Sequence, residues 1–149
     1  MQNHIIREYI LYRYYPNKSH VDGFFDEDDG NIYISKKLGK IAREIVFAHE
    51  SQHRDCYNNK CKCWGRGTDY WCEYHAFRAE FRFVLRKNSK RYWKAYFEGV
   101  IRDLTKFKDT SIRSWGAHFQ ALCKVCRFKA FQEAARRYGF QKSIEGLCS

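Results

Sequence analysis

The sequence predicts an α+β fold, with a small antiparallel sheet of about three strands followed by about five helices. Two observations favour this class: strand-like segments occupy the first 35 residues, and apolar residues recur at helical spacing from there to about residue 140. A single proline and nine scattered glycines leave no obvious linker. We therefore expect residues 1–149 to form one domain.

Strands are predicted at residues 5–14, 21–25 and 32–35. The first alternates apolar and polar residues, and it lacks the continuous apolar region and cleavage site of a signal peptide. The turn-forming DEDDGN joins the other two strands. All apolar runs are far shorter than a membrane span, so we expect a cytoplasmic protein that has no membrane partner.

Helices are predicted after the strands. The first extends from residue 36 to about residue 57, with Ser35 as its N-cap. The others cover about residues 68–87, 89–104, 110–123 and 128–138. Gly139 follows the last of them and is a suitable C′ residue.

The first predicted helix ends in the sequence HESQH. Residues four apart lie on one helix face, so His49 and His53 can direct their imidazoles at one metal ion. Glu50 then lies beside a water molecule held by that metal and can act as its general base. Ile45 continues the His49 stripe with an apolar residue. The alternative is a surface helix that carries two histidines by chance.

The segment WCEYHAFRAEF supplies candidates for a third ligand, since a catalytic zinc usually takes three protein ligands. Glu73 is the first choice, because it follows His53 by twenty residues, enough for one loop and a return. Glu80 shares the helix face of Glu73, whereas His75 points roughly the opposite way. Both His75 and Glu80 remain reserve ligands. The alternative interpretation of Glu73 is a solvated helix carboxylate.

Three segments together resemble the zincin metallopeptidases of the glutamate-ligand branch: strand-like GNIYIS, the helix ending in HESQH, and EYHAF. The chain is most similar to the small ImmA/IrrE-type domains. The resemblance covers about residues 21–85 and implies a zincin-like core there, with a basic helical part at about 89–140. It implies one catalytic zinc held by His49, His53 and Glu73, with Glu50 as catalytic base. Phe77 stands where larger members have an acid that orients a ligand histidine.

We therefore expect a zinc-dependent metallopeptidase that hydrolyses peptide bonds in a protein or peptide substrate. The resemblance implies that this substrate can be a regulatory protein. Candidate donors to the oxyanion are Tyr70, Tyr74 and His118, between which the sequence does not choose. In related zincins an edge strand before the HExxH helix pairs with the substrate, so residues 32–35 are expected to do so.

The chain has seven cysteines, which is many for a protein expected inside the cell. Two close pairs could meet and hold a second, structural zinc with four thiolates. These are Cys61, Cys63, Cys123 and Cys126, with Cys56 or Cys72 as substitutes. The chief alternative is that the cysteines are small buried apolar residues, and disulfides in an oxidising compartment are a lesser one.

The chain is strongly basic, with 28 Lys and Arg against 17 Asp and Glu, a formal net charge of +11 and a pI near 9.4. Basic residues are interleaved with aromatic residues between positions 78 and 94. Such segments can bind phosphates and stack on bases, although a solvated basic face over an aromatic core has the same pattern. A nucleic acid and an acidic protein are both candidate partners.

Two alternative functions stay open. A SprT-like protease that acts on proteins attached to DNA also combines HExxH, basic character and a cysteine zinc site. Its third ligand is a histidine, so His75 would replace Glu73. The other alternative is a basic nucleic-acid-binding or regulatory module whose metal site is not catalytic.

Overall fold

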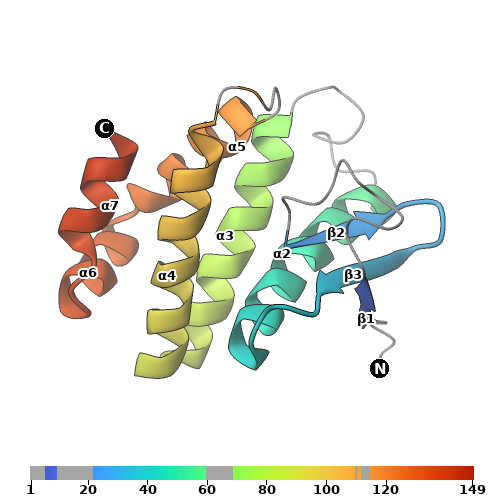
Figure 1. Cartoon of the computed structure of the whole chain (residues 1–149), viewed down its shortest axis with the longest axis horizontal. Coiled ribbons are helices and arrows are strands. Elements are labelled where there is room, and N and C mark those ends of the chain that lie inside the picture. Colours follow the sequence, from blue (N-terminus) through green and yellow to red (C-terminus); the bar gives the residue numbers. More distant parts are fainter. Residues whose placement is uncertain (1–5, 10–21, 60–68, 110, 112–114) are drawn as a thin grey trace.

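The computed structural model of the chain describes residues 6–9, 22–59, 69–109, 111 and 115–149 (Figure 1). Its elements are β1 (Ile6–Tyr9), β2 (Gly23–Asp26), β3 (Asn31–Ser35), α2 (Lys40–Asn58), α3 (Asp69–Lys87), α4 (Lys90–Phe107), α5 (Trp115–Cys126), α6 (Lys129–Arg137) and α7 (Gln141–Cys148). The described residues are mostly helical and carry one small sheet. The predicted α+β class is confirmed at this level.

The sheet has the strand order β1-β3-β2. β2 and β3 form its antiparallel part, with Asp26 opposite Asn31, as predicted. β1 pairs with β3 in parallel, with Ile6 opposite Ile32. The expectation of an entirely antiparallel sheet with residues 32–35 at its edge is therefore wrong, because β3 is the central strand. A tight turn makes β2 and β3 run in opposite directions, whereas β1 and β3 are separated in the sequence by residues 10–30, a length that permits parallel pairing.

The hairpin of β2 and β3 could be predicted from the sequence because of the residues in its turn. Gly30 has φ of +74°, a conformation that glycine adopts without strain, and its N–H donates to the Asp26 carbonyl at 2.8 Å. The Asp26 carboxylate accepts from the Asp28 N–H at 2.9 Å, and the Asp29 carboxylate accepts from the Asn31 N–H at 2.8 Å. Aspartates and glycine in DEDDGN thus supply the local hydrogen bonds of a turn.

The predicted N-cap of the first helix is wrong. Ser35 is the last residue of β3, and its N–H donates to the Asp22 carbonyl at 2.8 Å. Its hydroxyl accepts from the Lys37 N–H at 3.2 Å, which closes a turn before the helix. α2 begins only at Lys40, after Gly39. The hydrogen bond of Ser35 with Asp22 keeps Ser35 in the sheet, so it does not cap α2.

The later helices agree with the sequence in kind but differ in their ends. The helix predicted from residue 89 begins at Lys90, and Ser89 is its N-cap, whose hydroxyl accepts from the Tyr92 N–H at 3.3 Å. Gly139 follows α6 with φ of +84°, as expected of a C′ residue. The helix predicted over 110–123 instead covers Trp115–Cys126, and α7 was not predicted at all.

An aromatic core lies among the helices. Phe97 is fully buried, and its ring centroid lies 5.5 Å from that of Trp93 and 5.3 Å from those of Phe131 and Phe140. Phe81 and Trp93, two of the aromatic residues interleaved with basic ones, are buried in this core. They are therefore not available to stack on bases.

Helix α2 lies between the sheet and α3, which in turn packs against α4 and α5 (Figure 1). One face of α2 therefore meets β2 and β3, and another meets α3. No helix in the described part of the chain combines the length and apolar character needed to cross a membrane.

The approach of β2 to α2 requires a residue without a side chain at position 23. A Cβ added to Gly23 would lie 2.7 Å from Val46 Cγ1 and 2.9 Å from the Tyr33 carbonyl oxygen. Gly23→Ala should lower the free energy of unfolding by about 1–3 kcal/mol, because β2 must move away from α2. Chemical denaturation of the variant measures this change.

Gly99→Ala is the matched control. Its added Cβ would come no closer than 3.6 Å to another group, and Gly99 lies within α4. Alanine is the better helix residue, so this variant should gain about 0.5–1 kcal/mol. Equal effects of the two substitutions would contradict close packing at Gly23.

Candidate metal centre

His49 and His53 lie one turn apart on α2 and face the same direction, as their spacing predicted. Their ring centroids are 4.9 Å apart. Both side chains are about nine-tenths buried, and Ile45, one turn before His49, is buried in the core. The amphipathic pattern of α2 therefore turns both imidazoles into the protein rather than toward solvent.

Glu73 reaches the two histidines from α3. Its Oε1 lies 3.0 Å from His49 Nε2, and its Oε2 lies 2.9 Å from His53 Nε2. The ligand atoms of these three residues all lie within 4.8 Å of one another, so the cluster could hold a metal ion. This is the ligand set expected from the sequence. It is the one group of this kind found among the residues that the structure describes.

Glu80 contacts the cluster from the next turns of α3, but through the far side of an imidazole. Its Oε2 lies 2.6 Å from His49 Nδ1, whereas Glu73 takes the Nε2 atom. A carboxylate on the second ring nitrogen fixes the orientation and tautomer of a ligand histidine. Sequence reasoning gave Glu80 only as a reserve ligand. Its shared helix face with Glu73 was the signal for its actual place.

Phe77 lies between Glu73 and Glu80 on the same face of α3. Phe77 is buried, and its ring packs edge-on to that of His49 with centroids 4.8 Å apart. The aromatic ring limits the positions available to the imidazole while Glu80 holds its Nδ1 atom. Phe77 and Glu80 together restrict the movement of His49.

Glu50 is buried beside the cluster, with 7% of its surface exposed. Its Oε2 lies 4.0 Å from His49 Nε2. A Cβ at Gly23 would lie 3.5 Å from Glu50 Cγ, so the bare backbone of β2 passes next to this side chain. Burial raises the pKa of Glu50 above its usual value, although the nearby histidines oppose this shift.

The charges within the cluster depend on one another. Burial lowers the pKa of His49, but hydrogen bonds to Glu73 and Glu80 outweigh burial and raise it well above its usual value. The pKa of His53 is also raised, because the charge and hydrogen bond of Glu73 outweigh burial. Burial favours the neutral form of Glu73, yet the two histidines hold its pKa well below normal. The cluster therefore keeps an ionised carboxylate inside the protein.

Of the three candidate oxyanion donors, which all lie in the described part of the chain, His118 is the one that contacts the cluster. It comes from α5, and its Nε2 lies 3.5 Å from Glu73 Oε2. Tyr74 packs instead against the ring of Phe128, with centroids 6.3 Å apart. Tyr70 packs edge-on to Trp71, with centroids 4.9 Å apart. Nothing in the sequence near His118 indicated that α5 would return to α3 at this point.

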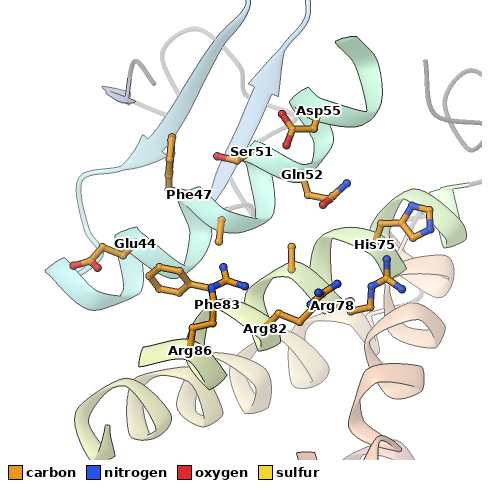
Figure 2. Close-up of a pocket in the computed structure, with 12 residues that line it drawn as sticks. Glu44, Phe47, Ser51, Gln52, Asp55, His75, Arg78, Arg82, Phe83 and Arg86 are labelled. Carbon is orange, nitrogen blue, oxygen red and sulfur yellow. The ribbon is translucent and has the colours of Figure 1, made fainter. Parts of the chain in front are cut away.

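His75, the other reserve ligand, is not brought to the cluster. It lines a groove between α2 and α3 that has a volume of about 370 Å³ (Figure 2). The groove lies on the faces of α2 and α3 that point away from His49 and Glu73. Figure 2 shows Arg78, Arg82 and Arg86 along its α3 side, at successive turns of the helix.

The cysteines give a different arrangement from the one expected. Cys61 and Cys63 lie outside the described residues, so the four-thiolate zinc site lies partly outside them as well. Cys123 and Cys126 are buried on α5, and Cys123 Sγ lies 2.7 Å from the sulfur of Cys148 on α7. The two substitutes, Cys56 and Cys72, are buried, and the Cys56 sulfur accepts from the Gln52 side-chain amide at 3.3 Å.

Comparison with protein-family models, with curated proteins and with solved structures finds no match to this chain. A function for this chain is therefore inferred from the geometry of the cluster formed by His49, His53 and Glu73 and from its neighbours Glu50 and Glu80.

Proposed function

We propose that the protein is a zinc-dependent metallopeptidase that hydrolyses peptide bonds in a protein substrate. One observation carries the proposal. His49, His53 and Glu73 converge from two helices with their ligand atoms within 4.8 Å, and the buried carboxylate of Glu50 lies beside them. Two histidines and a glutamate are a known catalytic ligand set for zinc, and such sites leave a position for water or substrate.

The distances within the cluster suit zinc. Tetrahedral ligands at about 2.0–2.1 Å from a zinc ion lie about 3.3 Å from one another. The contacts of Glu73 with His49 and His53 are 3.0 and 2.9 Å. These two contacts use different oxygens of Glu73, and the three ligand atoms lie within 4.8 Å of one another, so coordination requires a further approach of the side chains. Glu80 on His49 Nδ1 supports the same ligand geometry, because it leaves Nε2 as the atom that faces the metal.

The chain's own residues supply the acid–base chemistry. A bound zinc ion would polarise the substrate carbonyl and lower the pKa of water to about 7. Glu50 is positioned to accept the proton at Oε2 and to pass it to the leaving amine. His118 supplies a further donor near Glu73.

We place the substrate along β2. This strand lies at an edge of the described sheet and packs on α2, with Gly23 next to Glu50. An extended peptide that pairs with β2 brings its backbone toward Glu50. Residues 32–35 were expected to pair with the substrate, but they belong to β3, which has partners on both sides. We therefore assign the pairing with substrate to β2.

The SprT-like alternative is less well supported. It requires a histidine as third ligand, and the candidate was His75. That residue lines the groove on the other side of the helix pair, whereas Glu73 contacts both His49 and His53.

Metal content tests the ligand set. The purified chain should contain about one zinc per molecule at the cluster, and His53→Ala should lose it, because two protein ligands hold zinc far more weakly than three. Elemental analysis measures both. His75→Ala is the matched control and should retain the metal. Loss of zinc on His75→Ala, with retention on Glu73→Ala, would favour the SprT-like alternative.

Glu80→Ala should weaken zinc affinity by about 10–100-fold without abolishing binding, because the variant removes the orientation of His49 but no ligand. Competition with a chromophoric chelator measures the change. An unchanged affinity would contradict the orienting role of Glu80.

Glu50→Gln separates catalysis from metal binding. The substitution keeps the size of the side chain, but the amide cannot take a proton, so peptide cleavage should fall by on the order of 10²-fold or more while zinc remains bound. Digestion of a peptide library followed by mass spectrometry gives the rate. Glu98→Gln, an exposed change on α4, is the matched control and should cleave normally. Equal cleavage by the Glu50→Gln variant and the wild-type chain would overturn the catalytic role.

The groove on the far side of the helix pair favours a second candidate function, the binding of single-stranded nucleic acid. Arg78, Arg82 and Arg86 follow one another at intervals of four residues, which is about 6 Å along a helix. Phe47 and Phe83 also line the groove and offer rings for base stacking. Arg82 and Arg86 are exposed, and neither makes an ion pair with another described residue.

Salt dependence tests this second function. Replacing Arg82 and Arg86 by alanine should weaken binding to an oligothymidylate and reduce the slope of log affinity against log salt by about 1.4, at about 0.7 per phosphate contact. Fluorescence anisotropy at several salt concentrations measures the slope. Replacing the exposed Arg136 and Arg137 on α6 changes the net charge equally and is the matched control. Equal slopes for the two double variants would remove the groove as the binding site.

A further inference from the structure

Three cysteine side chains from two helices meet near the end of the described chain. Cys123 and Cys126 are one turn apart on α5, and Cys148 is the last residue of α7. The sulfur of Cys148 lies 2.7 Å from that of Cys123, and all three residues are free cysteines. The sequence pattern drew attention to Cys123 and Cys126 but gave no reason to pair either with Cys148.

The separation of Cys123 and Cys148 is close to that of a bonded pair. A disulfide has a sulfur–sulfur bond of about 2.05 Å, so the two atoms need to approach by only about 0.7 Å. Cys148 is the last residue of α7 and is only partly buried, so the adjustment involves no buried helix turn.

The three sulfurs differ in exposure and in charge. Cys123 and Cys126 are buried, whereas Cys148 is partly exposed. Hydrogen bonds from the thiols of Cys123 and Cys126 lower the pKa of Cys148 far below its usual value, and the nearby positive charges of Arg127 and Lys108 act in the same direction. The same hydrogen bonds raise the pKa values of Cys123 and Cys126. Its exposure and these neighbours make Cys148 the sulfur of the three that is best placed to react as a thiolate.

We propose that Cys148 is a peroxide-reactive cysteine that forms a reversible disulfide with Cys123. The Cys148 thiolate attacks a hydroperoxide, so that a sulfur–oxygen bond forms while the oxygen–oxygen bond breaks. The leaving oxygen takes a proton and departs as water or an alcohol. The Cys123 sulfur then loses its proton and attacks the sulfenic acid, and hydroxide takes that proton and leaves as water. The thiol pair loses two electrons, which the hydroperoxide gains.

The disulfide would connect α7 covalently to α5. α5 packs against α3 and carries His118, whose Nε2 lies 3.5 Å from Glu73. Oxidation at one end of α5 thus acts on a helix that reaches the metal cluster at its other end. In a reducing compartment such a pair is reduced at rest and oxidised transiently, as redox-sensing cysteines are.

Thiol counting on the full-length chain tests the proposal. The reduced protein is treated with a small excess of hydrogen peroxide, denatured, alkylated and analysed by intact mass and peptide mapping. Two of the seven thiols should escape alkylation, and a cross-linked peptide should join Cys123 to Cys148. Treatment with a dithiol should restore full alkylation. A cross-link between other cysteines, or none, would overturn the assignment.

Three variants identify the roles of the individual cysteines. Cys148→Ser should abolish the cross-link, and Cys123→Ser should leave a sulfenic acid at Cys148 that dimedone traps. Cys72→Ser, a buried cysteine on α3, is the matched control and should cross-link normally. A zinc ion that is retained in His49→Ala and protects Cys148 from peroxide would also contradict the proposal, because the thiols would then serve as metal ligands.

Discussion

The contact between α2 and α3 at Glu73 is the interaction that holds the candidate site together. A buried carboxylate is costly unless it is paired, and here both of its oxygens lie within 3.0 Å of an imidazole nitrogen. The same contact fixes the distance between the two helices, because α2 presents both histidines from one face. Glu80 and Phe77 then restrict His49 from the same face of α3. The cluster is therefore preorganised by helix packing.

α2 and α3 carry two different sets of polar side chains on opposite faces. The buried face collects histidines and glutamates whose charges depend on one another, and the outer face forms a groove lined by arginines (Figure 2). The main apolar core lies among α3, α4, α5 and α6, and it reaches the buried face at Ile45 and Phe77. The aromatic residues between positions 78 and 94 contribute to both regions, since Phe81 is buried in the core while Phe83 lines the groove.

Helix α5 links the two proposals made for this protein. Its first turn carries His118 to the carboxylate of Glu73, and its last turn carries Cys123 and Cys126 to the sulfur of Cys148. α5 packs extensively on α3, so a shift of one helix displaces the other. The two proposals together connect the oxidation state of Cys123 and Cys148 with the metal cluster through α5.

Features that depend on neighbouring residues could be predicted from the sequence. The spacing of His49 and His53 places both on one helix face, DEDDGN makes the hairpin turn, and Ser89 and Gly139 mark helix ends, because each effect acts within a few residues. Glu73 was the first choice of third ligand because of its spacing to His53, and the family resemblance implied the same residue. The folded structure was needed for the parallel direction of β1, the orienting place of Glu80, and the meetings of His118 with Glu73 and of Cys148 with Cys123. These depend on how whole elements pack, and no local pattern encodes the distance between residues that are far apart in the chain.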